Sequence, residues 1–407
     1  MNLLSPQPFW PLRDGLPAVF PPLENDVRCD VVIVGAGIGG ALVAWELAKS
    51  GVDAIVLDRR EAAHGSTAGS TSLLQYELDE PLHRLKHHLG AKRAERCYQR
   101  CREAIDDVAR AARDVGVDCG FSRRASLLLA SRASHLPRLR REFDARREAG
   151  LDVDWWTRRD VARESTLPHP AAILSRDGGQ VDAYRLAYAL LKGATRRGVR
   201  VHDRTAVTRK RVNARGVELR TGRGALVRAR HLVVATGFEA QEFLKRKVTA
   251  LHSTFAMVTE PVNQFSGWPA GRCLIWETAR PYLYLRITDD SRVMMGGYDE
   301  PFRDPASRDR LLGAKTRALA RRFKQFFPAV PIEVKTSWAG TFADTPDGLP
   351  YIGQHPELDR MWFALGYGGN GITFSAIAAE LIRDGILGRR NRDQELFAFA
   401  RGLADGA

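Results

Sequence analysis

The most regular hydrophobic pattern in the chain spans residues 30–58. Four consecutive apolar residues at 31–34 predict a strand that is buried on both faces. Apolar residues then recur at helical spacing over residues 41–49, and a glycine ends this segment. A second apolar run at residues 54–57 predicts another buried strand. The pattern therefore predicts a βαβ unit near the start of the chain.

Weaker periodicity predicts the remaining elements. Helical spacing predicts a closing helix that runs to about residue 387, and further helices at residues 82–112, 134–149, 182–197 and 309–327. Apolar runs predict a β-meander over residues 206–237, with strands at 217–219, 226–228 and 231–235, and other strands at 121–130, 199–202, 248–297 (several) and 362–365. Glycine, proline and aspartate make residues 338–353 a turn-rich segment.

Six prolines within residues 1–25 predict that the chain begins as an extended arm and not as a helix. The arm carries Phe9, Trp10 and Phe20. We expect these aromatic side chains to anchor it to the body of the protein. The alternative is an arm that reaches a partner subunit.

Three glycines, Gly35, Gly37 and Gly40, stand between the first predicted strand and its helix. In a G-x-G-x-x-G motif the first permits a tight turn, the second lets a pyrophosphate approach the backbone, and the third lets the helix pack on the strand. The free amides of the helix N-terminus attract the phosphate anion. Asp58 ends the second strand, where a carboxylate can accept hydrogen bonds from a ribose. The unit therefore predicts a dinucleotide-binding site, but it does not distinguish FAD from NAD.

Three turns supply further candidate contacts. Residues 64–72 are rich in hydroxyl side chains, which predicts either a phosphate- or flavin-contacting loop or a flexible turn. Thr236 and Gly237 follow a strand at its C-terminal end, where ligands of open α/β sheets lie. Residues 366–373 again form a strand, glycine turn and helix, so this helix N-terminus is a second place that favours negative charge.

Composition describes an ordinary soluble protein with room for about two or three domains. Of the 407 residues, 44% are hydrophobic and 27% are charged. The net charge is +14, but the basic residues are spread along the chain and no nucleic-acid motif accompanies them. A solvated basic surface is therefore favoured over nucleic-acid or membrane binding. Nothing in the pattern specifies the oligomeric state.

The five cysteines form no C-x-x-C pair and have no metal-ligand spacing, so we expect buried thiols, no metal site and a reducing compartment. The most hydrophobic run contains the glycine motif and is neither a signal peptide nor a membrane span. These features predict a cytoplasmic protein without an integral membrane segment.

Six segments, in order along the chain, together resemble the D-amino-acid-oxidase-like family of FAD-dependent oxidoreductases: VVIVGAGIGG, GSTAGST, VDAYRLAYALLKGATRRGVRV, LVVATG, TPDGLPYIG and LGYGGNGI. The resemblance covers most of residues 31–387. It implies an α/β fold in which a Rossmann-like FAD-binding domain is interleaved with an α+β substrate domain built on an antiparallel sheet. The implied ranges are an arm at 1–26, an FAD-binding domain at 27–85, 155–240 and 336–400, and a substrate domain at 86–154 and 241–335.

The resemblance also implies which residues hold the cofactor. The ADP half would contact the glycine motif and the acid that follows it, the middle loops would flank the pyrophosphate, and the last glycine turn would hold the flavin ring. In this sequence the implied FAD contacts are Gly35, Gly37, Ile38, Gly39, Gly40, Asp58, Arg59, Ser66, Thr67, Val207, Thr236, Gly237, Gly369, Asn370, Gly371, Ile372 and Thr373.

Four departures from the family pattern refine these expectations. The positions at which relatives attach FAD covalently are Gly340 and Gly69 here, so we expect non-covalent FAD. Phe342 replaces an arginine that grips a substrate carboxylate, which puts a plain α-amino acid in doubt. Thr373 replaces a lysine that assists oxygen, so the electron acceptor stays open between O2 and another molecule.

The implied reaction is oxidation of a C–N bond of a small amine or amino-acid-like substrate. Hydride moves from the carbon to flavin N5, and the imine hydrolyses; positioning and exclusion of water suffice without a catalytic acid or base. Rival hypotheses are a flavin-dependent hydroxylase and a non-catalytic flavin-binding subunit of a larger complex. The candidate residues for the substrate pocket, whose alternative role is structural, are Trp276, Tyr282, Tyr284, Arg286, Trp338 and Phe342. Arg286 is the candidate partner of a distal carboxylate.

Overall fold

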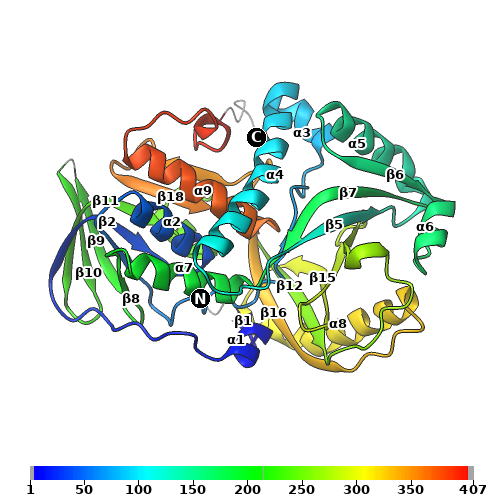
Figure 1. Ribbon diagram of the computed structural model, residues 1–407. Coiled ribbons are helices and arrows are strands. Elements are labelled where there is room, and N and C mark those ends of the chain that lie inside the picture. Colours follow the sequence, from blue (N-terminus) through cyan, green and yellow to red (C-terminus); the bar gives the residue numbers. More distant parts are fainter. Residues whose placement is uncertain (1–3, 214, 402–407) are drawn as a thin grey trace.

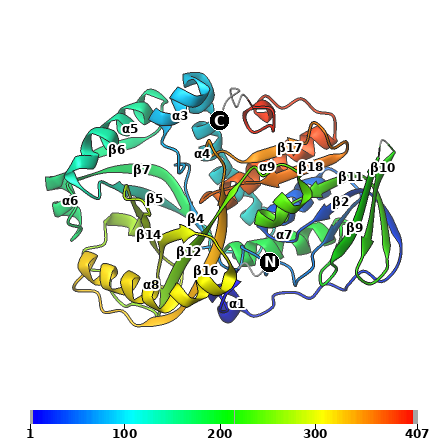
Figure 2. The same ribbon diagram turned by 180° about the vertical axis from the view of Figure 1, so that it is seen from behind.

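The computed structural model describes residues 4–213 and 215–401, and within them two β-sheets stand side by side with helices packed around them (Figures 1 and 2). One sheet has eight strands and the other ten in this part of the chain. The α/β class with an interleaved antiparallel sheet is confirmed.

The eight-stranded sheet is built around the predicted βαβ unit. Strand β2 pairs in parallel with β3 on one side and with β11 on the other. In sheet order its strands are β17 (Tyr351–Gln354), β18 (Met361–Leu365), β11 (Leu226–Val234), β2 (Val27–Val34), β3 (Ala54–Leu57) and β8 (Arg200–His202), and β10 (Gly216–Thr221) and β9 (Val207–Asn213) extend from β11.

Both faces of this sheet are covered, which explains why residues 31–34 of β2 and 54–57 of β3 are all apolar. Helices α2 (Ile38–Lys49), α7 (Ala183–Thr195) and α9 (Gly371–Ile386) share one hydrophobic core with alternate residues of β2 and β3. Strands β9 and β10 pack against the other face. These largely buried helices therefore fix the sheet in the middle of a three-layer arrangement.

The ten-stranded sheet is mostly antiparallel, with β13 and β5 as a parallel pair. In sheet order its strands are β1 (Leu4–Ser5), β16 (Val334–Asp344), β12 (Ala250–Thr259), β15 (Val293–Pro301), β14 (Leu283–Ile287), β13 (Leu274–Glu277), β5 (Ser122–Leu129), β7 (Ala171–Gln180) and β4 (Leu73–Leu74), and β6 (Val153–Thr157) pairs with β7. Helix α8 (Pro305–Phe326) buries phenylalanines on one face, and α5 (Leu136–Glu148) and α6 (Arg158–Glu164) pack around β5 to β7.

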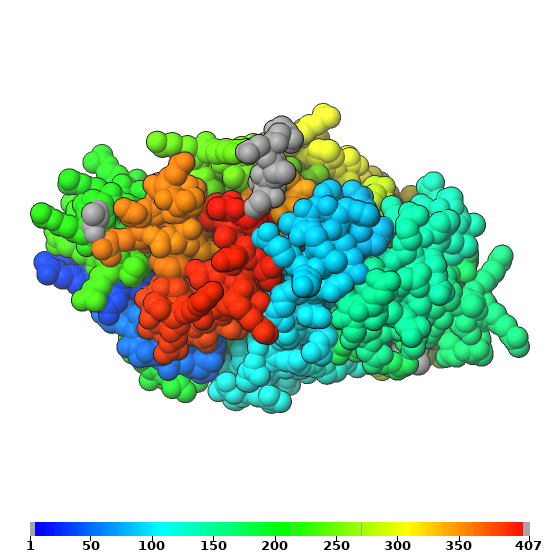
Figure 3. Space-filling model, turned by 90° about the horizontal axis from the view of Figure 1, so that it is seen from above, coloured from blue at the N-terminus to red at the C-terminus, as the bar shows by residue number. Residues whose placement is uncertain are grey.

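The C-terminal segment packs beside α9 and α4 (Figure 3). Arg96 and Arg100 of α4 (Ala91–Asp114) form ion pairs with Asp393 and Glu380 at 2.6 Å. Helix α3 (Leu82–Leu89) precedes α4, and the short 3₁₀ turns are η1 (Ala133–His135), η2 (Gly237–Phe243), η3 (Ala270–Arg272) and η4 (Gln394–Leu396).

The N-terminal arm is not fully extended as predicted, because α1 (Phe9–Asp14) is a helix. Pro8 caps this helix and Pro11 lies in its first turn, where a missing N–H breaks no helical hydrogen bond. Phe9, Trp10 and Phe20 are buried in the body of the same chain, as expected of anchors. The proline count alone therefore misled the prediction.

Three other boundaries differ from the prediction. Gly90, at φ 78°, divides the single helix expected at 82–112 into α3 and α4. The two strands expected at 226–228 and 231–235 are one strand, β11. The first part of the turn-rich segment at 338–353 is the end of β16, because Trp338 and its neighbours pair with β12. The domain ranges stay a prediction. The strands β4, β7 and β16, which fall largely within the ranges predicted for the FAD-binding domain, hydrogen-bond into the ten-stranded sheet.

Candidate active site

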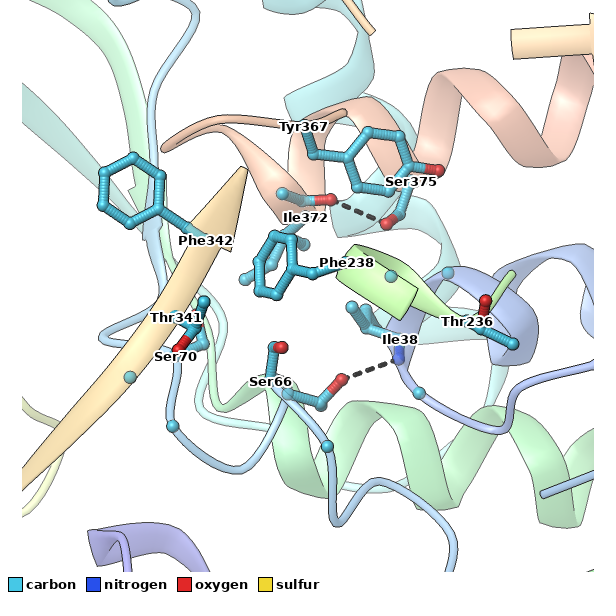
Figure 4. Close-up of a pocket in the computed structure, with 18 of the residues that line it drawn as sticks. Ile38, Ser66, Ser70, Thr236, Phe238, Thr341, Phe342, Tyr367, Ile372 and Ser375 are labelled. Atoms are coloured by element: carbon cyan, nitrogen blue, oxygen red, sulfur yellow. Dashed lines mark hydrogen bonds between the residues drawn. The ribbon is translucent and has the colours of Figure 1, made fainter. Parts of the chain in front are cut away.

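A cavity of about 400 Å³ is lined by strand ends and loops from both sheets (Figure 4). The carboxyl ends of β2, β3 and β11 contribute Val34, Leu57 and Ala235. This is the edge at which open α/β sheets bind ligands. Its size lies in the range of small-molecule sites.

Two glycines of the motif, Gly35 and Gly40, are packed too tightly for any other residue type. A Cβ on Gly35, at φ 110°, would lie 2.4 Å from the carbonyl oxygen of Ala235, and one on Gly40 would lie 1.8 Å from that of Gly35. Helix α2 has Gly37 at its N-cap and no side-chain cap there, so its first turn presents backbone amides to the cavity. A phosphate-bearing cofactor fits this cradle.

The hydroxyl-rich loop at 64–72 is held in place along its length. The hydroxyl of Thr67 accepts a hydrogen bond from the Ile38 amide at 2.9 Å. The indole nitrogens of Trp10 and Trp338 donate to the carbonyls of Ser70 at 2.6 Å and Gly69 at 2.9 Å. The loop, including Ser66, is thus a built wall of the cavity and not a free turn.

Asp58 lies at the end of β3 with both carboxylate oxygens engaged. Oδ2 accepts from the Ala36 amide at 2.7 Å and Oδ1 from the Arg60 amide at 2.9 Å. Burial raises the pKa of Asp58, and these amides oppose the rise. Glu239, which follows the Gly237 turn and was not predicted, forms ion pairs with Arg59 and Arg60. Val207, Thr236 and Gly237 line the same part of the cavity.

The N-terminus of α9 faces the cavity from the other side. Its N-cap, Asn370, directs its side chain away from the helix and donates to the carbonyls of Gln75 and Glu77, each at 3.0 Å. Gly369, Gly371 and Ile372 line the cavity, so the amides of the first turn remain directed at it. Thr373 does not line it; its hydroxyl donates to Gln75 at 3.2 Å. A flavin ring that becomes negatively charged on reduction fits this helix end.

The chain matches the DAO family profile, described as FAD dependent oxidoreductase, over residues 30–384. It belongs to this family. The sequence is 26% identical over 382 residues to the glycine oxidase of Bacillus licheniformis, covering 91% of this chain and 96% of that protein. It is also 26% identical over 394 residues to the gamma-glutamylputrescine oxidoreductase of Escherichia coli (strain K12), covering 92% and 87%. The crystal structure of glycine oxidase from Geobacillus kaustophilus has the same fold, with a TM-score of 0.78 at 22% identity, covering 92% of this chain and 99% of that one.

Membership of the DAO family identifies the dinucleotide as FAD and settles the choice that the glycine motif left open. The predicted contacts from Gly35 to Ile372 meet in one cavity, except that Gly40 acts through packing and Thr373 points elsewhere. Their individual contacts with FAD stay predictions.

The aromatic wall is the part of this DAO-family cavity that strands β12 to β16 and their flanking residues supply: Thr254, Trp276, Tyr282, Tyr284, Asp299, Gly340, Thr341 and Phe342. Four of the six predicted pocket residues belong to it. Trp338 does not, because its ring is buried beneath Gly69. In Figure 4, Phe238 and Ile372 lie on one side of the end of β16, and the ring of Phe342 extends from the other side of this strand.

Arg286, the candidate partner of a distal substrate carboxylate, lies outside the cavity lining, and its position favours the alternative structural role. Its side chain is 2% exposed and lies behind the 64–72 loop, outside the cavity lining. Its Nε donates to the Thr71 carbonyl at 2.6 Å and its guanidinium lies 5.4 Å from the Trp10 ring. Burial lowers its pKa to about 10. Arg286 therefore stabilises the loop from behind.

Several lining residues were missed by the sequence prediction: Gln75, Asp79, Phe238, Asp299, Thr341 and Tyr367. Asp79 lies in a segment without periodicity, and no local signal marks it. Asp299 had a usable signal, because Gly296 and Gly297 interrupt a strand pattern and indicate a bulge.

We expect the substitution Arg286→Met to weaken FAD binding about tenfold, because the charge-assisted hydrogen bond to the Thr71 carbonyl of the loop is lost. The KM for substrate should stay unchanged. Fluorescence titration of apoprotein with FAD measures the first quantity and steady-state kinetics the second. Arg228→Met is the matched control, since Arg228 is a strand arginine on the surface that pairs with Glu218 at 2.9 Å. A raised KM with unaltered FAD affinity would instead support substrate binding by Arg286.

Proposed function

We propose that the protein is an FAD-dependent amine oxidase or dehydrogenase that oxidises a C–N bond of a small amine or amino-acid-like substrate. One observation carries the proposal: a single cavity joins the glycine-motif cradle at α2 to the aromatic wall, with the N-terminus of α9 between them. The site can hold the two halves of FAD and leave room for a substrate at the flavin end.

Each part of the cavity has a distinct task in this proposal. Bound FAD supplies the acceptor for a hydride from the carbon next to the substrate nitrogen. The amides of α2 and the 64–72 loop hold the phosphates, and those of α9 stabilise negative charge at the ring. Tyr282, Tyr284 and Phe342 position the substrate and exclude water. The oxidised product is an imine, which takes up water outside the site to give a carbonyl compound and an amine.

The family match and the relatives favour this reaction over a flavin-dependent hydroxylase or a non-catalytic subunit. The glycine oxidase and the gamma-glutamylputrescine oxidoreductase are both named for nitrogen-containing substrates. The electron acceptor stays open between O2 and another molecule.

The test is the visible spectrum of the purified protein under anaerobic conditions, before and after addition of a panel of amines and amino acids. Bleaching of the flavin bands by a member of the panel supports C–N oxidation, and recovery of the bands in air identifies O2 as an acceptor. Flavin bands that no member bleaches would overturn the proposal.

FAD in this protein is proposed to be non-covalent, because the described residues that line the cavity include neither cysteine nor histidine. We expect acid precipitation to release all the yellow colour into the supernatant, with FAD recovered intact by chromatography. Flavin fluorescence of the denatured polypeptide on a gel measures the bound fraction. A fluorescent protein band would show a covalent link.

We also propose a reducing compartment such as the cytoplasm. The five cysteines are buried free thiols, and burial raises the pKa of each of them. Among the described helices, none combines the length and apolar composition that crossing a bilayer requires.

A further inference from the structure

On the side of the cavity that faces the ten-stranded sheet, the described lining residues include carboxylates but no basic side chain; Arg280 lies behind this lining, 3.9 Å from Asp79 and 4.6 Å from the Tyr282 ring. Asp79 and Asp299 line it, whereas the basic residues that line the cavity, among those described, are Arg59 and Arg60 at the end of β3 in the other sheet. A chain with a net charge of +14 thus places no positive side chain in the aromatic wall. The carboxylate of a plain α-amino acid would find no partner there.

The negative lining continues outward from this wall. A second cavity of about 170 Å³ shares Asp79, Tyr367 and Asn370 with the first. Glu80 and Asp344 also line it, and its described lining residues include no lysine, arginine or histidine. A substrate longer than the first cavity would therefore extend along acidic side chains.

Asp299 is the carboxylate in this region that has one oxygen left without a hydrogen-bond donor. Its Oδ1 atom is buried and accepts no hydrogen bond, and no basic side chain lies at ion-pair distance among residues 4–213 and 215–401. By contrast, Asp79 accepts from the Gly369 amide at 3.2 Å and lies 3.9 Å from Arg280, and Asp344 lies 3.3 Å from His252. A buried carboxylate oxygen without a donor is costly, and a donor from a ligand would satisfy it.

A β-bulge directs this carboxylate. Ser253 pairs with Glu300 and Phe255 with Gly297, so Tyr298 and Asp299 stand opposite the single residue Thr254. Bulges commonly change the direction of a side chain beside a site. Burial raises the pKa of Asp299 to about 6, with Asp79 and Asp344 adding to the rise and Thr254 and Arg280 opposing it.

Aromatic rings flank the same position. The Tyr282 ring lies 6.1 Å from that of Trp276 and 5.9 Å from that of Tyr284, and the hydroxyls of Tyr284 and Thr254 are 3.3 Å apart. Ring faces of this kind stabilise ammonium groups through cation–π attraction. Arg280 already lies over the Tyr282 ring at 4.6 Å, so the Asp299 carboxylate and the rings of Trp276 and Tyr284 are the groups that can receive a further cation.

We propose that the substrate is an amine with a second positive charge, and that its distal ammonium group pairs with Asp299 while the aromatic wall brackets its alkyl chain. This inference rests on the proposed function and narrows its substrate class to diamines and longer polyamines. Asp299 is a specificity-determining residue, and the hydride leaves from the carbon at the other end of the substrate.

The experiment compares two probes of equal length, 1,4-diaminobutane and n-pentylamine, which differ in the distal charge. We measure flavin reduction in the holoenzyme by anaerobic stopped flow and compare the reduction rate constant divided by Kd for the two probes. This ratio should be about 30-fold higher for the diamine, which is the gain expected from one charge-assisted hydrogen bond. Asp299→Asn should remove this preference, because the distal ammonium group loses its charged partner. Glu300→Gln is the matched control, because Glu300 is its neighbour on β15 and pairs with Lys315 at 2.6 Å.

The outcomes separate the two proposals. Equal reduction by both probes, or an equal loss for both in Asp299→Asn, would overturn the diamine inference and leave C–N oxidation intact. If no amine reduces the flavin, the proposed function fails, and the perturbation of the flavin spectrum on probe binding tests the inference alone. The diamine inference is supported if the diamine binds more tightly than n-pentylamine and Asp299→Asn abolishes this difference. It is overturned if both probes bind equally well.

Discussion

The substitution Gly40→Ala should abolish FAD binding and lower the free energy of unfolding by about 3 kcal/mol. The new methyl group would lie 1.8 Å from the Gly35 carbonyl oxygen, which belongs to the backbone and cannot rotate away. Relief requires α2 to move off β2, and that movement withdraws its N-terminal amides from the phosphate position. The measurements are the flavin absorbance of the purified variant and its urea denaturation.

The same substitution elsewhere supplies the control. Gly313 lies in the middle of α8, is exposed, and has only the flexible end of Arg317 near its hypothetical Cβ, at 3.6 Å. Gly313→Ala should therefore stabilise the protein by about 1 kcal/mol, since alanine is the better helix former. If both variants were stabilised and both were yellow, the close approach of α2 to β2 would not constrain the site.

The substitution Arg146→Met should cost about 3–5 kcal/mol of the free energy of unfolding, because it leaves buried carboxylates uncompensated. Arg146 is 1% exposed and its Nε lies 2.7 Å from Glu142, while its Nη1 lies 3.5 Å from Glu77. Glu142 also accepts from His83 at 2.8 Å. This cluster holds the segment that carries Gln75 and Asp79, so FAD binding should weaken as well. Urea denaturation of holoprotein and apoprotein separates the two effects.

The cluster also gives stability a dependence on pH. Burial acts to raise the pKa of Glu142, but Arg146 and His83 outweigh it, and the pKa is lowered from its ordinary 4.5. The contribution of this group is complete above about pH 4.5 and is lost as the pH falls through the lowered pKa. Arg140→Met on the same helix is the control, because Arg140 is exposed and its pair with Asp144 should contribute less than about 1 kcal/mol. Similar losses in both variants would contradict a special role for the buried cluster.

The features that the sequence predicted well are those set by local pattern. Residues 31–34 are apolar because the strand is buried on both faces, and the glycine spacing follows from contacts within one βαβ unit. The turn at Thr236 and Gly237 and the start of α9 were found for the same reason. The short helix at Phe9 was missed because the sequence does not show whether a proline lies in the first turn of a helix, where it is tolerated, or in an extended segment.

The side-chain directions could not be predicted, because they depend on packing between distant segments. Tyr284 and Arg286 lie two residues apart on β14 and so share one face, yet only Tyr284 reaches the cavity. The 64–72 loop separates them, and its position depends on Trp10 and Trp338, far away in the chain. Asp299 likewise depends on a bulge opposite Thr254.

The pairing of strands has a consequence for biosynthesis. The N-terminal strand β1 pairs with residues 339 and 340, and β2 takes its place in a sheet that also needs β11 and β18 (Met361–Leu365). Neither sheet can be completed until the last part of the chain has left the ribosome. Contacts so distant in sequence make folding slow, because the chain loses the entropy of closing long loops before strand pairing stabilises it. The growing chain therefore carries unpaired apolar strands for most of its synthesis, and we expect chaperones to raise its yield.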